Sequence, residues 1–585
     1  MKRYRLLCLP GAAWAALTAA VSFGCDTGIH RGDARDCDPG QKVVGGECVT
    51  LPKIHLNTVG YLPARPKIAT FVSGGGTQFD VLTRDGDVAL SGKASDAVVD
   101  PDTGAELRQI DFSELDEPGE YYLVVDGVGS SAPFRIGADV FVEPLRTAML
   151  GLYGQRCGVA VEIDTHHGHY EHGACHTAEA SLAALGLDGT REDRGGWHDA
   201  GDYGKYTGNG AFAVAFLLKA YEHFPAALND TELLIPERDN DVPDILDEAR
   251  VELEWLRKTQ LEDGSAVHKV TGKKFEGTMV PTFDLQPRFF VPSGTVATAD
   301  LAAVMALAAR IYEPFDASFA ESCLETAKRA YAFLEKNPGF IEPNQEGFTT
   351  GGYNDSTYKD DRAWAAAELF ETTGEEEYLD AFEELVRSRE VIETAFDWTQ
   401  TGNLAYVTYL FSSREGRDAG ILEAISRSLR SAGDALVGNA TSHGYGRAVG
   451  STYRWGVNGI LARTSFVLAA AYRQTPAPEY LDAITLQLDH LFGRNPYGRS
   501  YLTGIGFDPP RYPHHRPSTA AYPGRPWPGL LVGGPHGSPF PDAGKAVLPA
   551  LTWTDESNNY MHNEVAINWN TALVYALVAA QHAGN

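Results

Sequence analysis

Positive charge is scarce in this chain of 585 residues. It has 49 lysines and arginines against 78 aspartates and glutamates, and its formal net charge is −29 at pH 7. Proteins that bind nucleic acid or an anionic membrane need clustered positive charge to pair with phosphate groups. The composition therefore argues against both partners and favours a neutral or cationic ligand.

Long apolar runs are also rare, and the only one lies at the N-terminus. Basic residues precede an apolar run over 6–21, which is the layout of a secretory signal peptide. We therefore expect 1–24 to be a signal peptide and the protein to be exported. The run ends in "SFGC", so Cys25 resembles the lipidated cysteine of a bacterial lipoprotein at the cell surface or in the periplasm. A plain cleaved signal with secretion, or an uncleaved anchor, remains an alternative. No other segment is apolar over the length that a bilayer requires.

Cysteine is sparse, with seven in the chain. In an exported protein, Cys37 and Cys48 predict a disulfide that closes a small loop in a Gly/Asp-rich tether over 25–51. Cys323 lies in a helical pattern and is predicted to be a small buried side chain. Cys157 and Cys175 are left for a second disulfide or a metal site.

Two kinds of periodicity divide the rest of the chain. Over 52–138, short segments with alternating apolar residues are separated by turn residues. The segments are "IHLNTV", "KIATFV", "QFDVLT", "DVALSG", "LRQIDFS", "GEYYLVV" and "APFRIG". Short strands at this spacing predict an all-β sandwich of immunoglobulin type.

Over 139–585 the apolar residues recur at helical spacing. Segments such as "TADLAAVMALAARIYE" are apolar nearly all round, whereas "EEEYLDAFEELVRSREVIE" has a strongly charged face. Alternation of buried and half-exposed helices predicts a double ring, an all-α (α/α) barrel. Helix-poor stretches of this region are where function is expected, and they cover 263–296, 339–361, 438–458 and 494–562.

Two carboxylates stand close together in "GGWHDAGDYGKY", residues 195–206. In a turn, Asp199 and Asp202 can face the same way, and Gly201 lets the backbone approach another segment closely. Such a pair could order and deprotonate one water molecule. The alternatives are that the acids cap the helix that begins near Gly210 or hold a cation.

Two C-terminal stretches add further candidates. Glu564 precedes a strongly apolar helix and has Tyr560 nearby, a setting that raises the pKa of a carboxyl group as a general acid requires. The alternative is an acidic residue favoured by the helix dipole. The loop over 492–518 carries His514 and Arg516 among glycines and aromatics, which suits a hydroxyl-rich ligand or, alternatively, a rigid surface loop.

Six motifs then occur in a recognisable order. They are "NTVGYLPARPKIA", "GGWHDAGDYGKY", "VPDILDEARVELEWLRKTQ", "GRNPYGRSYLTGIG…PHHRP", "PGLLVGGPHG" and "NEVAINWN". With them the chain resembles glycoside hydrolase family 9, the inverting β-1,4-glucanases, in the subgroup with an N-terminal immunoglobulin-like domain. The resemblance implies an (α/α)6 barrel as the catalytic domain.

The resemblance implies catalytic roles for three acids. Asp202 matches the general base that activates the water, and Asp199 matches the acid that helps to position it. Glu564 matches the general acid that protonates the leaving glycosidic oxygen. Inversion requires acid and base on opposite faces of the sugar, with room for a water molecule between base and sugar.

The resemblance also implies residues that bind the substrate. His514 and Arg516 match groups that hold the sugar beside the scissile bond, and we add Tyr560 as a third binding residue. Asp508 and His536 depart from the residues usual in the family. We expect these two departures to affect specificity and not the acid and base.

Zinc is the first expected cofactor. Cys157, Cys175, His176 and His198 form a suitable tetrahedral ligand set. From the residues alone a Cys157–Cys175 disulfide is an equal alternative, and the histidines of 166–172 are further candidate ligands. Members of the subgroup resemble this chain at the four positions and carry zinc there, so the resemblance implies a structural zinc that anchors the loop with the two aspartates.

Calcium is the second expected cofactor. Family members bind it near a D-[ED]-x-x-W pattern, and "STYKDDRAW" provides Ser356, Asp360 and Asp361 here. Asp397 could complete an oxygen cage. The alternative is a solvated acidic turn.

These observations predict a monomeric, exported endo-β-1,4-glucanase that acts on cellulose or a related β-glucan. No cellulose-binding module is visible, so we expect amorphous or soluble polymer as substrate. The alternatives are an exo-acting glycosidase on cello- or amino-sugar oligosaccharides and a non-catalytic carbohydrate-binding protein, which the presence of all three acids disfavours. Candidates to stack on sugar rings are the aromatic residues Trp364, Trp398, Tyr445, Tyr453 and Trp455, and we expect several of these five to belong to the core instead.

Overall fold

The computed structural model divides the chain into two compact units, 1–51 and 52–585. It describes 41–44, 47–50 and 52–584, apart from 230, 388, 390 and 538–547. The first unit contains an antiparallel hairpin of β1 (Gln41–Val44) and β2 (Glu47–Thr50). The predicted signal peptide, Cys25 and Cys37 lie outside the described residues, so the lipidation of Cys25 and the Cys37–Cys48 disulfide stay predictions.

The second unit begins with a two-sheet β-sandwich. One sheet has the order β3–β4–β8–β7 and the other β10–β9–β5–β6, with β11 also paired to β9. Alternate side chains of both sheets, such as Phe71, Phe79 and Leu123, meet in a common core. The strands are β3 (Ile54–His55), β4 (Ile68–Val72), β5 (Gln78–Thr83), β6 (Val88–Lys93), β7 (Val98–Val99), β8 (Glu106–Asp111), β9 (Gly119–Val125), β10 (Gly129–Ser130) and β11 (Phe134–Ile136). The predicted sandwich is confirmed, with the short β7 and β10 in addition.

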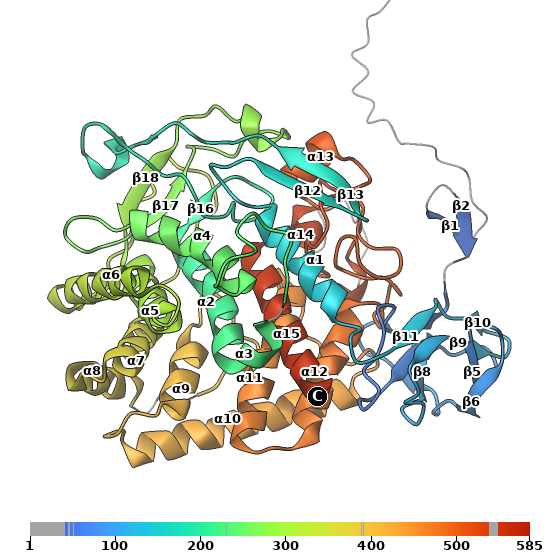
Figure 1. The fold of residues 1–585 in the computed structure, drawn as a ribbon. Coiled ribbons are helices and arrows are strands. Elements are labelled where there is room, and N and C mark those ends of the chain that lie inside the picture. The colour runs from blue at the N-terminus through green and yellow to red at the C-terminus, as the bar shows by residue number, and fades with distance from the viewer. Residues whose placement is uncertain are drawn as a thin grey trace, which may run out of the picture. The chain divides into compact units, whose positions relative to one another are not determined.

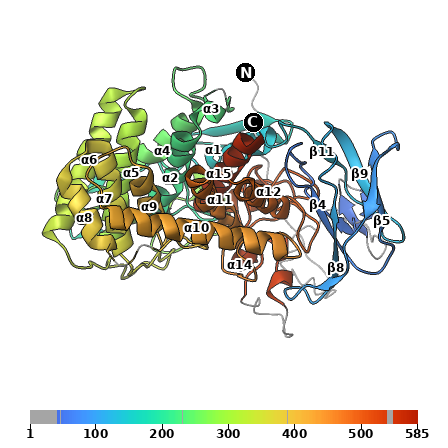
Figure 2. The same ribbon diagram turned by 90° about the horizontal axis from the view of Figure 1, so that it is seen from below.

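Two concentric rings of helices follow (Figures 1 and 2). The inner ring consists of α2 (Thr207–His223), α5 (Thr295–Tyr312), α7 (Lys359–Thr373), α9 (Gly402–Phe411), α11 (Val457–Gln474) and α15 (Ile567–Gly584). The outer ring consists of α1 (Val142–Tyr153), α4 (Asp244–Lys258), α6 (Ala317–Lys336), α8 (Glu376–Val386), α10 (Ala419–Ser442) and α12 (Pro478–Leu491). The (α/α)6 barrel predicted for this region is therefore confirmed.

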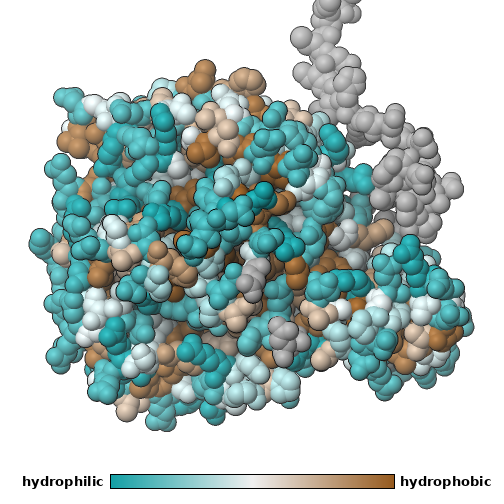
Figure 3. Space-filling model, in the orientation of Figure 1, coloured by the Kyte–Doolittle hydropathy of each residue, from teal (hydrophilic) through white to brown (hydrophobic). Residues whose placement is uncertain are grey.

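The two rings differ in composition because they differ in burial. Inner helices such as α2 and α5 bury most of their residues, whereas outer helices such as α6 and α10 bury one stripe. Within the described part, α5 is the one helix long and apolar enough to cross a membrane, and most of it is buried inside the protein. Hydrophilic residues predominate on the face shown in Figure 3, where apolar side chains are scattered.

Shorter elements lie in the segments that connect the barrel helices. A five-stranded sheet has the order β15–β14–β18–β17–β16, and β12 pairs with β13 in a separate hairpin. The elements are β12 (Val161–Thr165), β13 (Gly168–His172), β14 (Ala180–Ser181), β15 (Thr190–Arg191), β16 (Lys205–Tyr206), β17 (Val267–Thr271), β18 (Phe289–Ser293), α3 (Pro225–Leu228), α13 (Arg516–Ala521) and α14 (Tyr560–Asn563).

The first segment of the sandwich supports a loop of the barrel. Asn57 Nδ2 donates to Asp489 Oδ1 at 2.9 Å, and Thr58 Oγ1 donates to the carbonyl of Phe492 at 2.7 Å. The same hydroxyl accepts from the backbone N–H of Phe507 at 2.9 Å. The sandwich thus holds both ends of the loop that leads to His514.

Candidate active site

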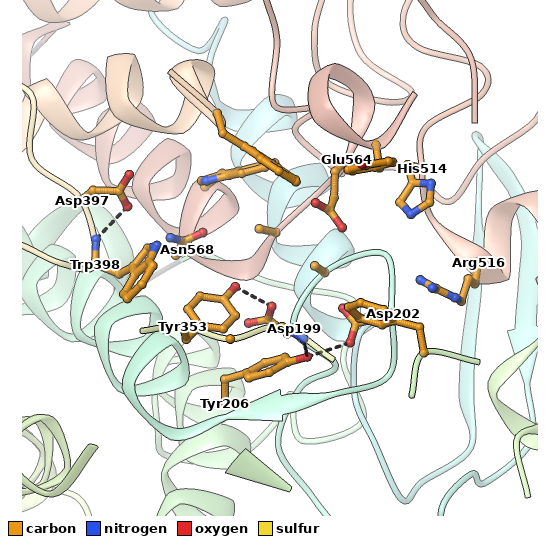
Figure 4. Close-up of a pocket in the computed structure, with 18 residues that line it drawn as sticks. Asp199, Asp202, Tyr206, Tyr353, Asp397, Trp398, His514, Arg516, Glu564 and Asn568 are labelled. Atoms are coloured by element: carbon orange, nitrogen blue, oxygen red, sulfur yellow. Dashed lines mark hydrogen bonds between the residues drawn. The ribbon is translucent and has the colours of Figure 1, made fainter. Parts of the chain in front are cut away.

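A cavity of about 730 Å³ lies at the N-terminal ends of the inner helices. Its walls come from segments far apart in the sequence that directly precede α2, α9, α11 and α15 (Figure 4). The lining residues are Asp199, Ala200, Asp202, Tyr206, Phe275, Gly351, Gly352, Tyr353, Asp397, Trp398, Trp455, His514, Arg516, Tyr560, Glu564, Ala566, Asn568 and Trp569. All three predicted catalytic acids and all three predicted binding residues are among them.

Asp199 is buried and held by two donors. Tyr353 Oη donates to Oδ2 at 2.6 Å, and Asn209 Nδ2 donates to Oδ1 at 2.6 Å. The backbone carbonyl of Asp199 accepts from the N–H of Ile567 at 2.9 Å. This last bond ties the aspartate motif to the start of α15, next to Glu564.

Asp202 is held through one of its oxygens. Tyr206 Oη and the backbone N–H of Gly204 both donate to Oδ2, at 3.1 and 2.9 Å. A Cβ atom at Gly201 would lie 2.3 Å from the carbonyl oxygen of His514, so only glycine lets these two loops pack together. The close approach predicted for Gly201 is therefore present.

Glu564 lies between α14 and α15. A β-bridge pairs it with His514, whose N–H donates to the carbonyl of Asn563 at 2.7 Å. The backbone carbonyl of Glu564 accepts from the N–H of Gly533 at 2.8 Å. Figure 4 shows its carboxyl group pointing into the cavity towards Asp199 and Asp202.

Two of the three carboxyl groups, those of Glu564 and Asp199, have a raised pKa. Burial, and then the charges of Asp202 and Asp199, raise the pKa of Glu564 well above its usual range. Burial and the charge of Asp202 also raise the pKa of Asp199, whereas the donors Tyr353 and Asn209 oppose that rise. Glu564 therefore keeps its proton at neutral pH.

Arg516 is held in place by a fourth carboxyl group. Its Nε lies 2.9 Å from Glu276 Oε1, and both side chains are largely buried. Burial and the charge of Asp202 raise the pKa of Glu276 to about 7. The Arg516 guanidinium also lies 5.6 Å from the ring centre of Phe275, so the loop between β17 and β18 orients this arginine.

The geometry agrees with comparisons with known proteins. The model for "Glycosyl hydrolase family 9" matches 141–577, and that for "Cellulase N-terminal ig-like domain" matches 50–130. The chain belongs to glycosyl hydrolase family 9.

The similarity extends over most of this family 9 enzyme. It is 43% identical to Endoglucanase D of Acetivibrio thermocellus over 529 residues, which cover 90% of this chain and 83% of the relative. It is 37% identical to a metagenome-derived family 9 endoglucanase of known structure, with a TM-score of 0.85 and coverage of 91% and 99% of the two chains. A zinc-binding triple mutant of the family 9 endoglucanase J30 is 34% identical, with a TM-score of 0.83 and coverage of 88% and 99%. The prediction of a family 9 endoglucanase is confirmed.

The predicted aromatic platform is correct in part. Trp398 and Trp455 line the cavity of the enzyme. Trp364 is fully buried within α7, while Tyr445 and Tyr453 contact the sandwich, so these three are the candidates that serve packing instead of the cavity. Periodicity does not distinguish a loop that faces the cavity from one that packs on a neighbouring domain.

The four predicted zinc ligands come together beside the aspartate motif. Their ligand atoms all lie within 4.8 Å of one another. Cys157 Sγ is 3.7 Å from His176 Nδ1, Cys175 Sγ is 3.7 Å from His198 Nε2, and the two imidazoles approach to 3.3 Å. These separations are close to the edges of a zinc tetrahedron with nitrogen and sulfur ligands, which are about 3.3–3.8 Å. The two thiols are free, and the histidines of 166–172 lie outside this cluster in the described structure.

The residues predicted to hold calcium lie in two places. Asp360 Oδ2 accepts from the backbone N–H of Thr401 at 3.0 Å, and Asp361 Oδ1 accepts from the hydroxyl of the same threonine at 2.8 Å. Ser356 lines a small pocket together with Asp360. Asp397 lines the main cavity. The calcium site stays a prediction.

The departures from the family pattern also have defined positions. Asp508 Oδ2 lies 2.7 Å from Arg499 Nε, in the interior of its loop. The ring of His536 lies 6.3 Å from that of Trp455, which lines the cavity. Of the two, His536 is the one placed to affect the substrate.

Sequence reasoning missed several residues of the site. Tyr206, Tyr353, Asn209 and Glu276 contact the predicted acids or Arg516, and none was singled out. Tyr206 ends the quoted aspartate motif, and Tyr353 lies in a predicted functional segment. Their positions in the sequence could have marked Tyr206 and Tyr353 as candidate site residues. Which residues they contact depends on the tertiary structure.

Proposed function

We propose that the enzyme cleaves β-1,4-glucosidic bonds within cellulose or a related β-glucan, with inversion at the anomeric carbon. The observation that carries the proposal is the cavity in which Glu564 points at Asp199 and Asp202 (Figure 4). The names of the similar endoglucanases support the β-glucan substrate and the internal site of cleavage.

Glu564 is the proposed general acid. Its raised pKa keeps the proton available at neutral pH, and the proton passes to the glycosidic oxygen as the bond to the leaving sugar breaks. The carboxyl group opens to the cavity and is shielded from bulk solvent by its walls.

Asp202 is the proposed general base, and Asp199 the residue that positions the water. Asp202 takes a proton from a water molecule on the opposite face of the sugar while the oxygen attacks the anomeric carbon. Asp199 accepts a hydrogen bond from the same water, and Tyr353 and Asn209 fix its orientation. The two aspartates thus hold the nucleophile in place before the bond breaks.

The walls of the cavity suit a glucan chain. Trp398, Trp455 and Tyr560 provide apolar faces against which sugar rings can stack, and His514 and Arg516 provide donors for hydroxyl groups beside the acids.

The experiment follows the products of cello-oligosaccharide cleavage by proton NMR. The α-anomer is expected first from each cut, and initial release of the β-anomer would refute inversion. On carboxymethylcellulose an endo-acting enzyme lowers viscosity with few new reducing ends. Release of short products at constant viscosity would instead favour the exo-acting alternative.

We also propose that Cys157, Cys175, His176 and His198 hold zinc. Burial lowers the pKa of His198 to about 4, so its imidazole is in the neutral form that a metal requires. Bound zinc would supply a structural crosslink beside Asp199. The zinc-binding triple mutant of endoglucanase J30 supports zinc binding by a protein of this fold, and metal analysis of the purified protein tests the site.

Calcium at Ser356, Asp360, Asp361 and Asp397 and export of the chain are proposed on the sequence alone. Calcium analysis of dialysed protein and the mass of the mature N-terminus test them.

A further inference from the structure

A second cluster of metal-ligating side chains lies outside the cavity lining, where the turn of the β12–β13 hairpin meets α1. Figure 1 labels this hairpin and α1. His166 and His167 occupy this turn, and Glu143 stands in the first turn of α1. The Nε2 atoms of both histidines lie 3.5 Å from Glu143 Oε1. One ligand atom from each residue falls within 4.8 Å of the other two.

The spacing suits a metal ion better than hydrogen bonds. An N–H···O bond has its usual length near about 2.9–3.0 Å, so 3.5 Å is long for either imidazole. Two ligands bound to zinc at about 2.0–2.1 Å in tetrahedral geometry are about 3.3–3.4 Å apart. Two imidazoles therefore converge on one carboxylate oxygen at close to the separation that zinc ligands adopt.

The surrounding structure holds His167 in this orientation. The backbone N–H of His167 donates to Thr165 Oγ1 at 3.2 Å, and its backbone carbonyl accepts from Tyr170 Oη at 3.0 Å. The side chain of His167 is 8% exposed.

Glu143 is held from its own helix. Thr147 Oγ1, one turn along α1, donates to Glu143 Oε1 at 3.2 Å and lies 3.3 Å from His167 Nε2. The carboxylate and the less exposed histidine are thus arranged around one point before any ion binds. His166 and Glu143 are more exposed, which leaves the point open to solvent.

We propose that His166, His167 and Glu143 bind a divalent transition-metal ion of the zinc type, with the remaining coordination position open to water. Two imidazoles and one carboxylate suit zinc, whereas calcium takes oxygen ligands alone. The bound ion joins the hairpin to the first helix of the barrel. This site is separate from the cluster of Cys157 and Cys175, although the hairpin lies between those two cysteines in the sequence.

The test measures how much zinc each chain binds. The full-length protein is incubated with excess Zn²⁺ and desalted, and zinc per chain is measured by elemental analysis. The variants are His166→Asn and Glu143→Gln. The matched control is His169→Asn, because His169 is half-exposed on the same hairpin and lies between Glu162 and Glu171 instead of facing α1.

We expect the wild type and His169→Asn to hold one zinc per chain more than His166→Asn and Glu143→Gln. Because the cysteine cluster is present in all four proteins, the difference counts only the hairpin site. Equal zinc in all four, or an equal loss in the His169 control, would overturn the proposal.

Thermal unfolding provides a second measurement. Added zinc is expected to raise the midpoint of the wild type and of the control more than that of His166→Asn, since an ion that binds only the folded chain stabilises it. An equal response of all proteins would show that no ion joins the hairpin to α1.

Discussion

Replacement of Glu564 by glutamine tests the proposed general acid without a change of charge. Burial and the two aspartates raise the pKa of Glu564, so the carboxyl group is protonated and neutral at neutral pH. Glutamine is also neutral and has nearly the same shape. The charges around Asp199 and Asp202 therefore stay as they are, and only the transferable proton is lost.

The expected loss is large for natural substrates. A positioned general acid contributes about 10²–10⁴-fold to the rate, which is about 2.7–5.4 kcal/mol of activation free energy. We expect kcat for cello-oligosaccharides to fall by this factor with little change in KM. A substrate that releases dinitrophenolate needs no proton on its leaving group, so its loss is expected to be below about tenfold.

The assay compares kcat for cellopentaose and for dinitrophenyl β-cellobioside in the wild type and the variant. Glu276→Gln is the control, since it makes the same chemical change in another carboxyl group near the cavity that contacts Arg516. Unimpaired turnover of cellopentaose by Glu564→Gln would refute the role of Glu564. An equal loss on both substrates would indicate a structural defect instead of a missing proton.

Three further predictions concern the surroundings of the acids. Burial and the charge of Asp202 raise the pKa of Asp199 to about 8, and the Tyr353 hydroxyl opposes that rise; Tyr353→Phe therefore raises this pKa further, so activity is lost at a higher pH as pH falls, and an unchanged pH–rate profile would contradict this. Glu276→Gln weakens the hold on Arg516 and is expected to raise KM about 5–10-fold with kcat nearly constant, and a loss confined to kcat would speak against that role. Removal of zinc by a chelator is expected to lower the midpoint of thermal unfolding and to expose the two thiols of the cysteine cluster to a thiol reagent; identical midpoints and thiol counts before and after treatment would exclude zinc there.

Much of the site could be predicted because its chemistry is concentrated in short motifs. Asp199 and Asp202 are neighbours in one loop, and His514 and Arg516 in another, so local spacing was enough to group them. The supporting residues could not be predicted in the same way. Tyr353 reaches Asp199 from a segment that precedes another inner helix, and no local pattern records that contact.

The aromatic residues show the same limit. Trp364 lies within α7 and is fully buried, whereas Trp398 lies just before α9 and lines the cavity. Both environments favour a large apolar side chain. Composition therefore identified the type of residue but not which surface it meets.

The sequence by itself determined the two folds and the reactive groups. Alternating apolar residues require one buried face in each strand, and residues apolar on all sides require a helix enclosed by others, so the sandwich and the double ring follow from local pattern. Only the tertiary structure decided which groups meet. The ring of inner helices brings their N-terminal ends to one cavity, and it is this closure that places Glu564 opposite Asp199 and Asp202. The packing of the β12–β13 hairpin on α1 likewise brings His166 and His167 to Glu143, a contact between separate elements that neither periodicity specifies.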